Sequence, residues 1–264
     1  MRLPIDIVDA FTRERFGGNP AAVVVLEEWL PAASMQAIAA ENNLSETAFV
    51  RREADGAFAI RWFSPLTEVA FCGHATLASA HVIARRGLAP FPISVRAAAV
   101  GELYVSRLAD GEGFEMSFPN LAPQALDTVP DALLAGLSIA PQQVLRNRQA
   151  YIAVYADERQ VRDVVPDLER LKALAPLDVA VTAPGRDHDF VSRYFWPANG
   201  GSEDPVTGSI HAALVPYWAA RLGRGELVAL QASARSGLLR CRVEGERVHV
   251  AGSTVQYLQG HIEV

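Results

Sequence analysis

Apolar and polar residues follow two different spacings along this chain. Residues 3–9 alternate in the manner of a half-buried strand, and residues 21–26 form the continuous apolar run of a fully buried one. Residues 31–42 instead place their apolar side chains at helical intervals. The pattern therefore predicts a mixed α/β (α+β) protein.

One aromatic segment occurs twice when the sequence is shifted by 132 residues. The residues that coincide are Asp55, Phe58, Arg61, Phe63 and Pro65 with Asp187, Phe190, Arg193, Phe195 and Pro197. Each copy then passes through a loop to Gly73 or Gly208, where a helical run begins that ends at Gly87 or Gly223. This repetition predicts two similar lobes, each with one helix whose exposed N–H groups suit an anion.

The strands that follow the two helices set the expected lobe boundaries. Three short strands are expected after each helix, at 93–97, 101–107 and 113–118, and again at 227–232, 237–243 and 246–252. We therefore expect an N-terminal lobe over residues 1–118 and a C-terminal lobe over 119–255, joined by the proline-rich residues 119–130. The strand-like residues 256–264 are left over, and we expect them to return to the first lobe.

Composition excludes several classes of protein. Half of the 264 residues are hydrophobic, which argues against disorder, and the net charge of −6 comes without a basic stripe that would bind nucleic acid. No apolar run approaches the length of a membrane-spanning helix, and the first residues lack the pattern of a signal peptide. With only two cysteines, Cys72 and Cys241, the expected location is a reducing cytoplasm.

Glu46 is the first candidate for chemistry, because it lies in an apolar segment that leads into a strand. Burial raises the pKa of a carboxyl group, which is what general acid/base catalysis near neutral pH requires. The alternative is a surface carboxylate that caps or flanks an element. Residue patterning alone leaves both interpretations open.

The start of each predicted helix carries the other candidates. Cys72 and His74 flank Gly73. Cys72 can be an activated thiol at the helix start or a small core residue, and His74 can be a site residue or an ordinary polar residue of the helix N-terminus. Asp204 lies in a glycine-rich acidic loop before Gly208, where it either complements the helix dipole or acts as a competing base. No metal-ligand spacing, dinucleotide fingerprint or Walker loop is present, so we expect a site without metal, nucleotide or other cofactor.

Four segments together resemble the PhzF (phenazine biosynthesis-like) family: 18–20, 43–47, 71–78 and 203–211. The resemblance runs in order over essentially the whole chain. It implies the diaminopimelate-epimerase-like fold, in which two pseudo-symmetric lobes each wrap a mixed, mostly antiparallel sheet around a central helix, with the site in the cleft between them. It also implies a homodimer.

The best understood member of that family isomerises trans-2,3-dihydro-3-hydroxyanthranilate by moving a proton, without any cofactor. By this resemblance Glu46 is the proton shuttle, and His74 and Asp204 are its polar partners in catalysis. The expected substrate-binding residues are Ser45, Gly73, Gly208 and Ser209. The resemblance thus implies an isomerase that acts on a small carboxylate-bearing molecule.

Two alternatives come from other classes of function. A cofactor-independent amino-acid racemase or epimerase needs a base on each face of the α-carbon, and the related epimerases place a cysteine before the helix glycine in each lobe. Here the first lobe has Cys72, whereas the second has Thr207. A PhzF-like binding protein without turnover is the other alternative.

Overall fold

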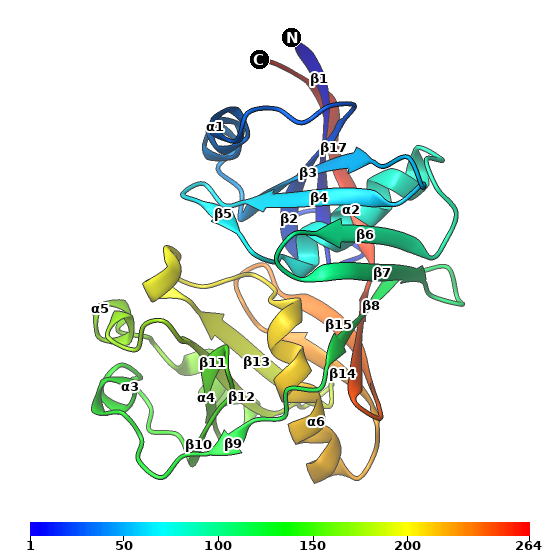
Figure 1. Ribbon diagram of the computed structural model, residues 1–264. Coiled ribbons are helices and arrows are strands. Elements are labelled where there is room, and N and C mark those ends of the chain that lie inside the picture. The colour runs from blue at the N-terminus through cyan, green and yellow to red at the C-terminus, as the bar shows by residue number, and fades with distance from the viewer. The chain divides into compact units, whose positions relative to one another are not determined.

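The structure is a computed structural model that describes residues 1–264, and the chain forms two compact units. Unit 1 comprises Met1–Ser117 and Ala251–Val264, and unit 2 comprises Phe118–Val250 (Figure 1). The chain leaves unit 1 within β8 (Phe114–Pro119) and returns to it within β16 (Arg247–Gly252). None of the helices is both long and apolar enough to cross a bilayer.

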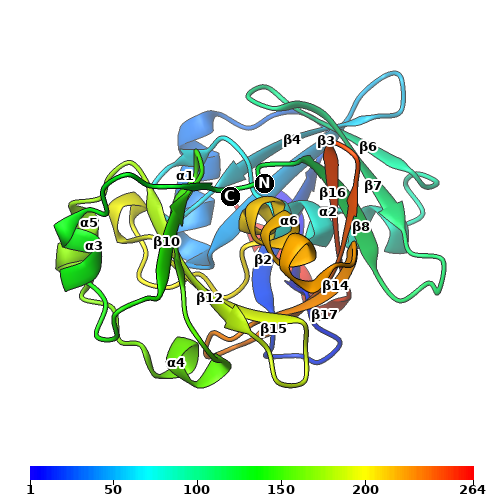
Figure 2. The same cartoon turned by 90° about the horizontal axis from the view of Figure 1, so that it is seen from below.

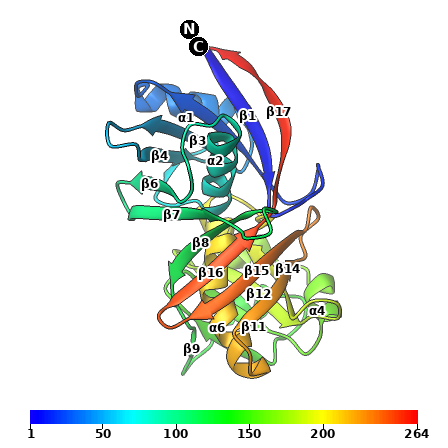
Figure 3. The ribbon, with the colours of Figure 1, turned by 90° about the vertical axis from the view of Figure 1, so that its right-hand side faces the viewer.

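Unit 1 contains two helices among its strands. Apart from β8 and β16, its elements in chain order are β1 (Arg2–Ala10), β2 (Asn19–Leu26), α1 (Ala32–Asn42), β3 (Glu46–Arg52), β4 (Phe58–Phe63), β5 (Glu68–Val69), α2 (Gly73–Arg85), β6 (Ile93–Ala97), β7 (Gly101–Arg107) and β17 (Thr254–Glu263). Strand β17 pairs antiparallel with β1 along its whole length, so the two chain ends lie at the same end of this pair (Figure 3).

Unit 2 contains several short helices and one longer helix. Its elements are β9 (Gln124–Ala125), α3 (Asp131–Ala135), β10 (Gln143–Arg146), β11 (Ala150–Val154), α4 (Glu158–Asp163), α5 (Leu168–Lys172), β12 (Asp178–Pro184), β13 (Phe190–Phe195), the 3-10 turns η1 (Pro197–Asn199) and η2 (Gly208–Ile210), α6 (His211–Leu222), β14 (Glu226–Gln231) and β15 (Gly237–Glu244).

The two units pair their strands in the same order. In unit 1, β1–β2 is antiparallel, β2–β3 parallel, β3–β4 antiparallel, β4–β6 parallel and β6–β7 antiparallel. In unit 2, the pairs β10–β11, β11–β12, β12–β13, β13–β14 and β14–β15 repeat this alternation. The two similar units predicted from the repeated segment and the mixed sheets implied by the family resemblance are therefore confirmed.

A buried helix organises the core of each unit. Helix α2 has buried residues on every side, ten of its 13, and its small alanine side chains let β1, β2 and β3 pack against it. Helix α6 buries Trp218 and most of its first half, and Figure 2 shows it close to end-on with β12, β14 and β15 beside it. Both helices are therefore covered by the sheets of their own units.

The second helix begins differently from the prediction of one helical run from Gly208. Residues Gly208–Ile210 form a 3-10 turn, and α6 starts only at His211. Within α6, Pro216 has no N–H group, so the carbonyl of Ala212 lacks its helical donor. The N–H group of Leu121 donates to that carbonyl at 3.0 Å. The proline thus creates an acceptor that attaches the segment after β8 to α6.

Gly18 sets the turn between β1 and β2. Its φ is +62°, and a Cβ atom there would overlap the carbonyl oxygen of Ala10. Only glycine meets both constraints, and the turn places Asn19 as the first residue of β2.

We predict that Gly18→Ala destabilises unit 1 more than Gly87→Ala does. Gly87 is the matched control, because its φ is +64° but no atom lies within 4 Å of the added Cβ. The left-handed conformation alone costs roughly 1–2 kcal/mol. The overlap at Gly18 adds a further ~1–3 kcal/mol. Urea unfolding of the two variants measures the difference, and equal losses of unfolding free energy would contradict the steric argument.

Candidate functional site

Three polar side chains meet where β2, β3 and α2 begin. Asn19 and Glu46 are the first residues of adjacent parallel strands, and His74 is the second residue of α2. The His74 Nε2 atom lies 3.2 Å from Glu46 Oε2, and Asn19 Nδ2 lies 3.1 Å from His74 Nδ1. Glu46 is only 9% exposed and His74 4%. The surface interpretation of Glu46 is therefore wrong.

The imidazole of His74 is neutral in this cluster. Burial lowers the pKa of His74 from 6.5 to about 3, because the charged ring would lose its hydration. The Asn19 amide nitrogen donates to Nδ1, which leaves the ring proton on Nε2. His74 Nε2–H then donates to the Glu46 carboxylate. The contact is thus a hydrogen bond from a neutral ring to a carboxylate.

Cys72 joins the same cluster from the residue before α2. It is the N-cap of the helix, it is 6% exposed, and its Sγ atom lies 3.4 Å from His74 Nδ1. Thr76 N–H closes the first helical turn on the Cys72 carbonyl, so the N–H groups of the residues between them have no helical acceptor. A thiol, an imidazole, a carboxylate and a helix N-terminus therefore converge in unit 1.

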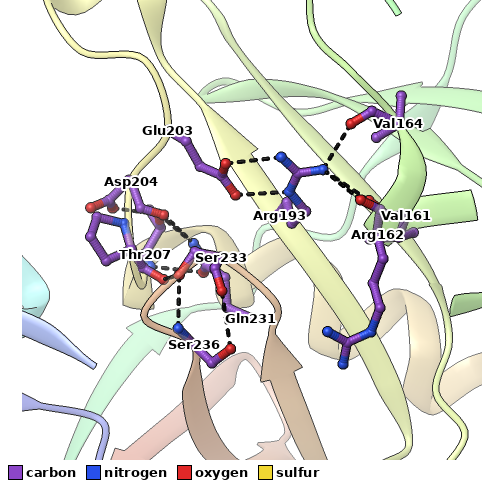
Figure 4. A network of polar contacts seen from close by, with 11 residues as sticks. Val161, Arg162, Val164, Arg193, Glu203, Asp204, Thr207, Gln231, Ser233 and Ser236 are labelled. Atoms are coloured by element: carbon purple, nitrogen blue, oxygen red, sulfur yellow. Dashed lines mark hydrogen bonds and ion pairs between the residues drawn. The ribbon is translucent and has the colours of Figure 1, made fainter. Parts of the chain in front are cut away.

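Unit 2 holds the other predicted residues, Asp204, Gly208 and Ser209. The Asp204 carboxylate accepts from Thr207 Oγ1 at 2.5 Å. Gln231 is fully buried, accepts from the Thr207 N–H group at 2.8 Å and donates to the Asp204 carbonyl at 2.8 Å (Figure 4). The loop before Gly208 is thus fixed by one amide side chain from the end of β14, which sequence analysis missed.

Glu203, the neighbour of Asp204, has a structural partner. The Arg193 guanidinium binds it with two parallel hydrogen bonds of 2.8 and 2.9 Å, and also donates to carbonyls at the end of α4 (Figure 4). Arg61 and Glu68 form the corresponding two-bond pair in unit 1, at 2.7 Å each. The repeated arginine therefore fixes a carboxylate after the aromatic strand in both units.

The starts of the two long helices also correspond. Thr76 Oγ1 donates to the carbonyl of Cys72 at 2.6 Å, and His211 Nδ1–H donates to the carbonyl of Thr207 at 2.9 Å. In each case a side chain bonds the carbonyl four residues earlier, so Thr207 occupies the position of Cys72. Ser45, the remaining predicted residue, is half-buried directly before β3.

The repeat also identifies a carboxylate that sequence analysis missed. The 132-residue shift places Glu46 on Asp178, and each is the first residue of its strand. Tyr194 donates to Asp178 Oδ2 at 2.6 Å, and the Gln149 amide donates to the Tyr194 hydroxyl at 3.0 Å and to Ser209 Oγ at 2.9 Å. Burial raises the pKa of Asp178 and that of Tyr194. A chain of hydrogen bonds thus joins Asp178 to the predicted residue Ser209.

Comparison with known proteins identifies the family of this chain. The model of the family described as "Phenazine biosynthesis-like protein" matches residues 8–260. The chain belongs to this family. It is 47% identical over 264 residues to an uncharacterized isomerase of Pseudomonas aeruginosa, covering 100% of both chains. An uncharacterized isomerase of Halalkalibacterium halodurans is 41% identical over 99% of each chain.

Solved structures place the fold in the same PhzF family. A PhzF-family protein of Enterococcus faecalis superposes with a TM-score of 0.94 at 41% identity, covering 100% of both chains. A hydroxyproline epimerase of Agrobacterium vitis shares the fold, with a TM-score of 0.59 at 12% identity, 99% of this chain and 92% of the other being covered. The PhzF chain described here is an enzyme of the isomerase class.

His211 predicts a pH dependence of stability. The ring is fully buried, its Nε2 atom has no hydrogen-bond partner, and burial lowers its pKa from 6.5 to about 4. Because of this shift, His211 of the unfolded chain becomes protonated at a higher pH than His211 of the folded chain. The free energy of unfolding therefore has its full value above about pH 6.5 and decreases as the pH falls toward 4. Between pH 7 and pH 5 the free energy of unfolding decreases by on the order of 2 kcal/mol through this residue.

The variant His211→Thr tests this contribution, because threonine makes the same carbonyl contact at the corresponding position 76. Its unfolding free energy should fall by about 2 kcal/mol less than that of the wild type between pH 7 and pH 5. Chemical denaturation at the two pH values measures this difference in pH dependence. A cavity left by the substitution lowers the unfolding free energy equally at both pH values, so it does not affect the comparison. Parallel pH profiles would show that His211 does not titrate as described.

Proposed function

We propose that this chain is a cofactor-independent isomerase that moves a proton on a small carboxylate-bearing substrate, in the manner of trans-2,3-dihydro-3-hydroxyanthranilate isomerase. The observation that carries this proposal is the buried Glu46 carboxylate, which lies 3.2 Å from a neutral imidazole beside a helix N-terminus. A positioned carboxylate in a largely dry site is suited to general acid/base work.

Each group at the start of α2 has a distinct part in this proposal. Glu46 takes a proton from one carbon of the substrate and returns it to another carbon on the same face. His74 Nε2–H holds the carboxylate in its orientation. The unpaired N–H groups after Cys72 bind the substrate carboxylate and stabilise the charge that develops when the proton leaves.

Asp204 is proposed as the second polar partner in catalysis, and the other predicted residues are assigned to substrate binding. Asp204 and Ser209 are fixed by Thr207 and Gln149, so both present rigidly held oxygen atoms. The proposed substrate-binding residues are Ser45 and Gly73 of unit 1 and Gly208 and Ser209 of unit 2. Hydrogen bonds from groups that are already oriented cost little reorganisation when substrate binds.

The composition of the two helix starts argues against the racemase alternative. A two-base mechanism needs a second acid/base group opposite the first, and Thr207 occupies the position of Cys72 in unit 2. Its hydroxyl donates to Asp204 at 2.5 Å. An alcohol with its proton in that bond is a poor base near neutral pH, so movement of a proton on one face fits these residues better.

We predict that Glu46→Gln abolishes the exchange of substrate protons with solvent and leaves the protein folded. A panel of cyclic and acyclic amino and hydroxy acids is incubated with the enzyme in deuterated water, and solvent deuterium in the recovered acid is measured. Loss of a general acid/base typically costs roughly 10²–10⁴ in rate. The matched control is Glu41→Gln, which changes an exposed carboxylate on α1 and should leave exchange unchanged.

Two outcomes would contradict this proposal. Exchange that survives in Glu46→Gln would remove Glu46 from the proton-transfer step. An absence of exchange with every acid in the panel would favour the binding-protein alternative. Thermal unfolding of both variants shows whether any loss of exchange comes from a loss of folded protein.

We also propose that the chain forms a homodimer, as the family resemblance implies. Light scattering over a series of protein concentrations should then give about twice the chain mass of 28.5 kDa. A mass equal to that of one chain at every concentration would contradict the dimer.

A further inference from the structure

Three different metal-ligating groups come together at the start of α2, although no metal motif is visible in the sequence. Glu46, Cys72 and His74 each present one ligand atom, and these atoms all lie within 4.8 Å of one another. Each of the three residues is at most 9% exposed. A carboxylate, a thiol and an imidazole are the three types of side chain that bind zinc in proteins.

The distances between these atoms approach those of a tetrahedral zinc site. Zinc bonds of about 2.0–2.3 Å at tetrahedral angles separate neighbouring ligand atoms by roughly 3.3–3.6 Å. In the structure, His74 Nε2 lies 3.2 Å from Glu46 Oε2 and 3.9 Å from Cys72 Sγ. The Sγ atom lies closer to Nδ1, at 3.4 Å, so the thiol has to turn toward Nε2 to close the site.

We propose that Glu46, Cys72 and His74 form a binding site for one zinc ion. The cation binds Glu46 Oε2, the Cys72 thiolate and His74 Nε2, and water completes the tetrahedron. The Cys72 thiol proton goes to solvent, and the proton on His74 Nε2 moves to Nδ1. Asn19, already next to Nδ1, accepts this proton in a hydrogen bond once its amide turns its oxygen toward the ring.

The mixed ligand set also predicts selectivity. Thiolate and imidazole ligands favour zinc and cobalt over magnesium and calcium, which prefer sites built from oxygen atoms. This zinc would be an inhibitor rather than a cofactor, because it occupies the Glu46 oxygen that takes the proton. That consequence for activity rests on the proposed function, whereas binding of the metal does not.

Cobalt titration tests the binding directly. The whole chain, reduced and freed of metal, is titrated with Co²⁺ while thiolate-to-cobalt charge-transfer absorption is recorded, and Zn²⁺ or Mg²⁺ is then added as a competitor. We expect one Co²⁺ per chain, displacement by Zn²⁺ and none by Mg²⁺. The Cys241→Ser variant is the matched control, since it removes the other buried cysteine and should titrate like the wild type.

Substitution of the ligands decides the assignment. Cys72→Ser should lose the charge-transfer band. Glu46→Gln should weaken binding by ~100-fold, since even the partners of ligands contribute 10–100-fold to affinity. A band that persists in Cys72→Ser, disappears in Cys241→Ser or never forms in the wild type would overturn the site. If Cys72→Ser does not fold, unchanged affinity in Glu46→Gln would overturn it equally.

Inhibition is measured in a separate experiment. Zinc at the concentration that saturates cobalt displacement should abolish solvent deuterium exchange, and excess chelator should restore it. Exchange that continues with the site filled would disprove the inhibitory role but leave the site itself intact. Failure of the proposed function would instead appear as no exchange in the metal-free protein.

Discussion

A helix enclosed by its own sheet has unpaired backbone groups only at its ends, and this constraint places the chemistry of unit 1. Helix α2 is largely buried, and the buried hydroxyls along it, those of Thr76 and Ser79, donate to carbonyls four residues earlier in the chain. Its first turn presents N–H groups without helical acceptors, and polar groups are stable beside them. Glu46, His74 and Asn19 are buried together there, where each finds a hydrogen-bond partner. The location of the candidate site thus follows from how the helix is buried.

Comparison of equivalent positions in the two units distinguishes residues that support the fold from candidate residues for chemistry. Arg61–Glu68 and Arg193–Glu203 keep the same two-bond geometry in both units, which marks them as supports for the loop after the aromatic strand. At the helix starts the residues differ, as with Cys72 and Thr207. The strand starts differ as well. The two units therefore share the backbone at the helix and strand starts but differ there in the chemical groups of their side chains.

The two equivalent carboxylates illustrate this divergence. Both oxygens of Asp178 accept hydrogen bonds, one from Tyr194 at 2.6 Å and one from Asn199 at 2.7 Å. Burial keeps the Tyr194 hydroxyl protonated, so its donation persists over the whole physiological pH range. Asp178 therefore anchors the hydrogen-bond chain that leads through Tyr194 and Gln149 to Ser209.

Much of this fold was predictable because its signals are local. The strand at 93–97 and the helix at 31–42 agree closely with β6 and α1, since each has a clear periodicity. Helix α4 was missed, because six residues with a single buried side chain, Val161, carry almost no periodic signal. The role of Gln231 was also unpredictable, because an amide at a strand end reveals its partners, 24 and 27 residues away, only after folding.

The neutral state of His74 is the feature that sequence could not supply and that the candidate chemistry most requires. A protonated imidazole would place a positive charge 3.2 Å from the Glu46 carboxylate and favour its charged form, which weakens a carboxylate as a base. Burial lowers the pKa of His74 to about 3, so at neutral pH the ring donates a hydrogen bond without adding charge. The same enclosure that removes water from the carboxylate therefore also keeps its partner neutral, and both effects come from packing β2, β3 and α2 around one point.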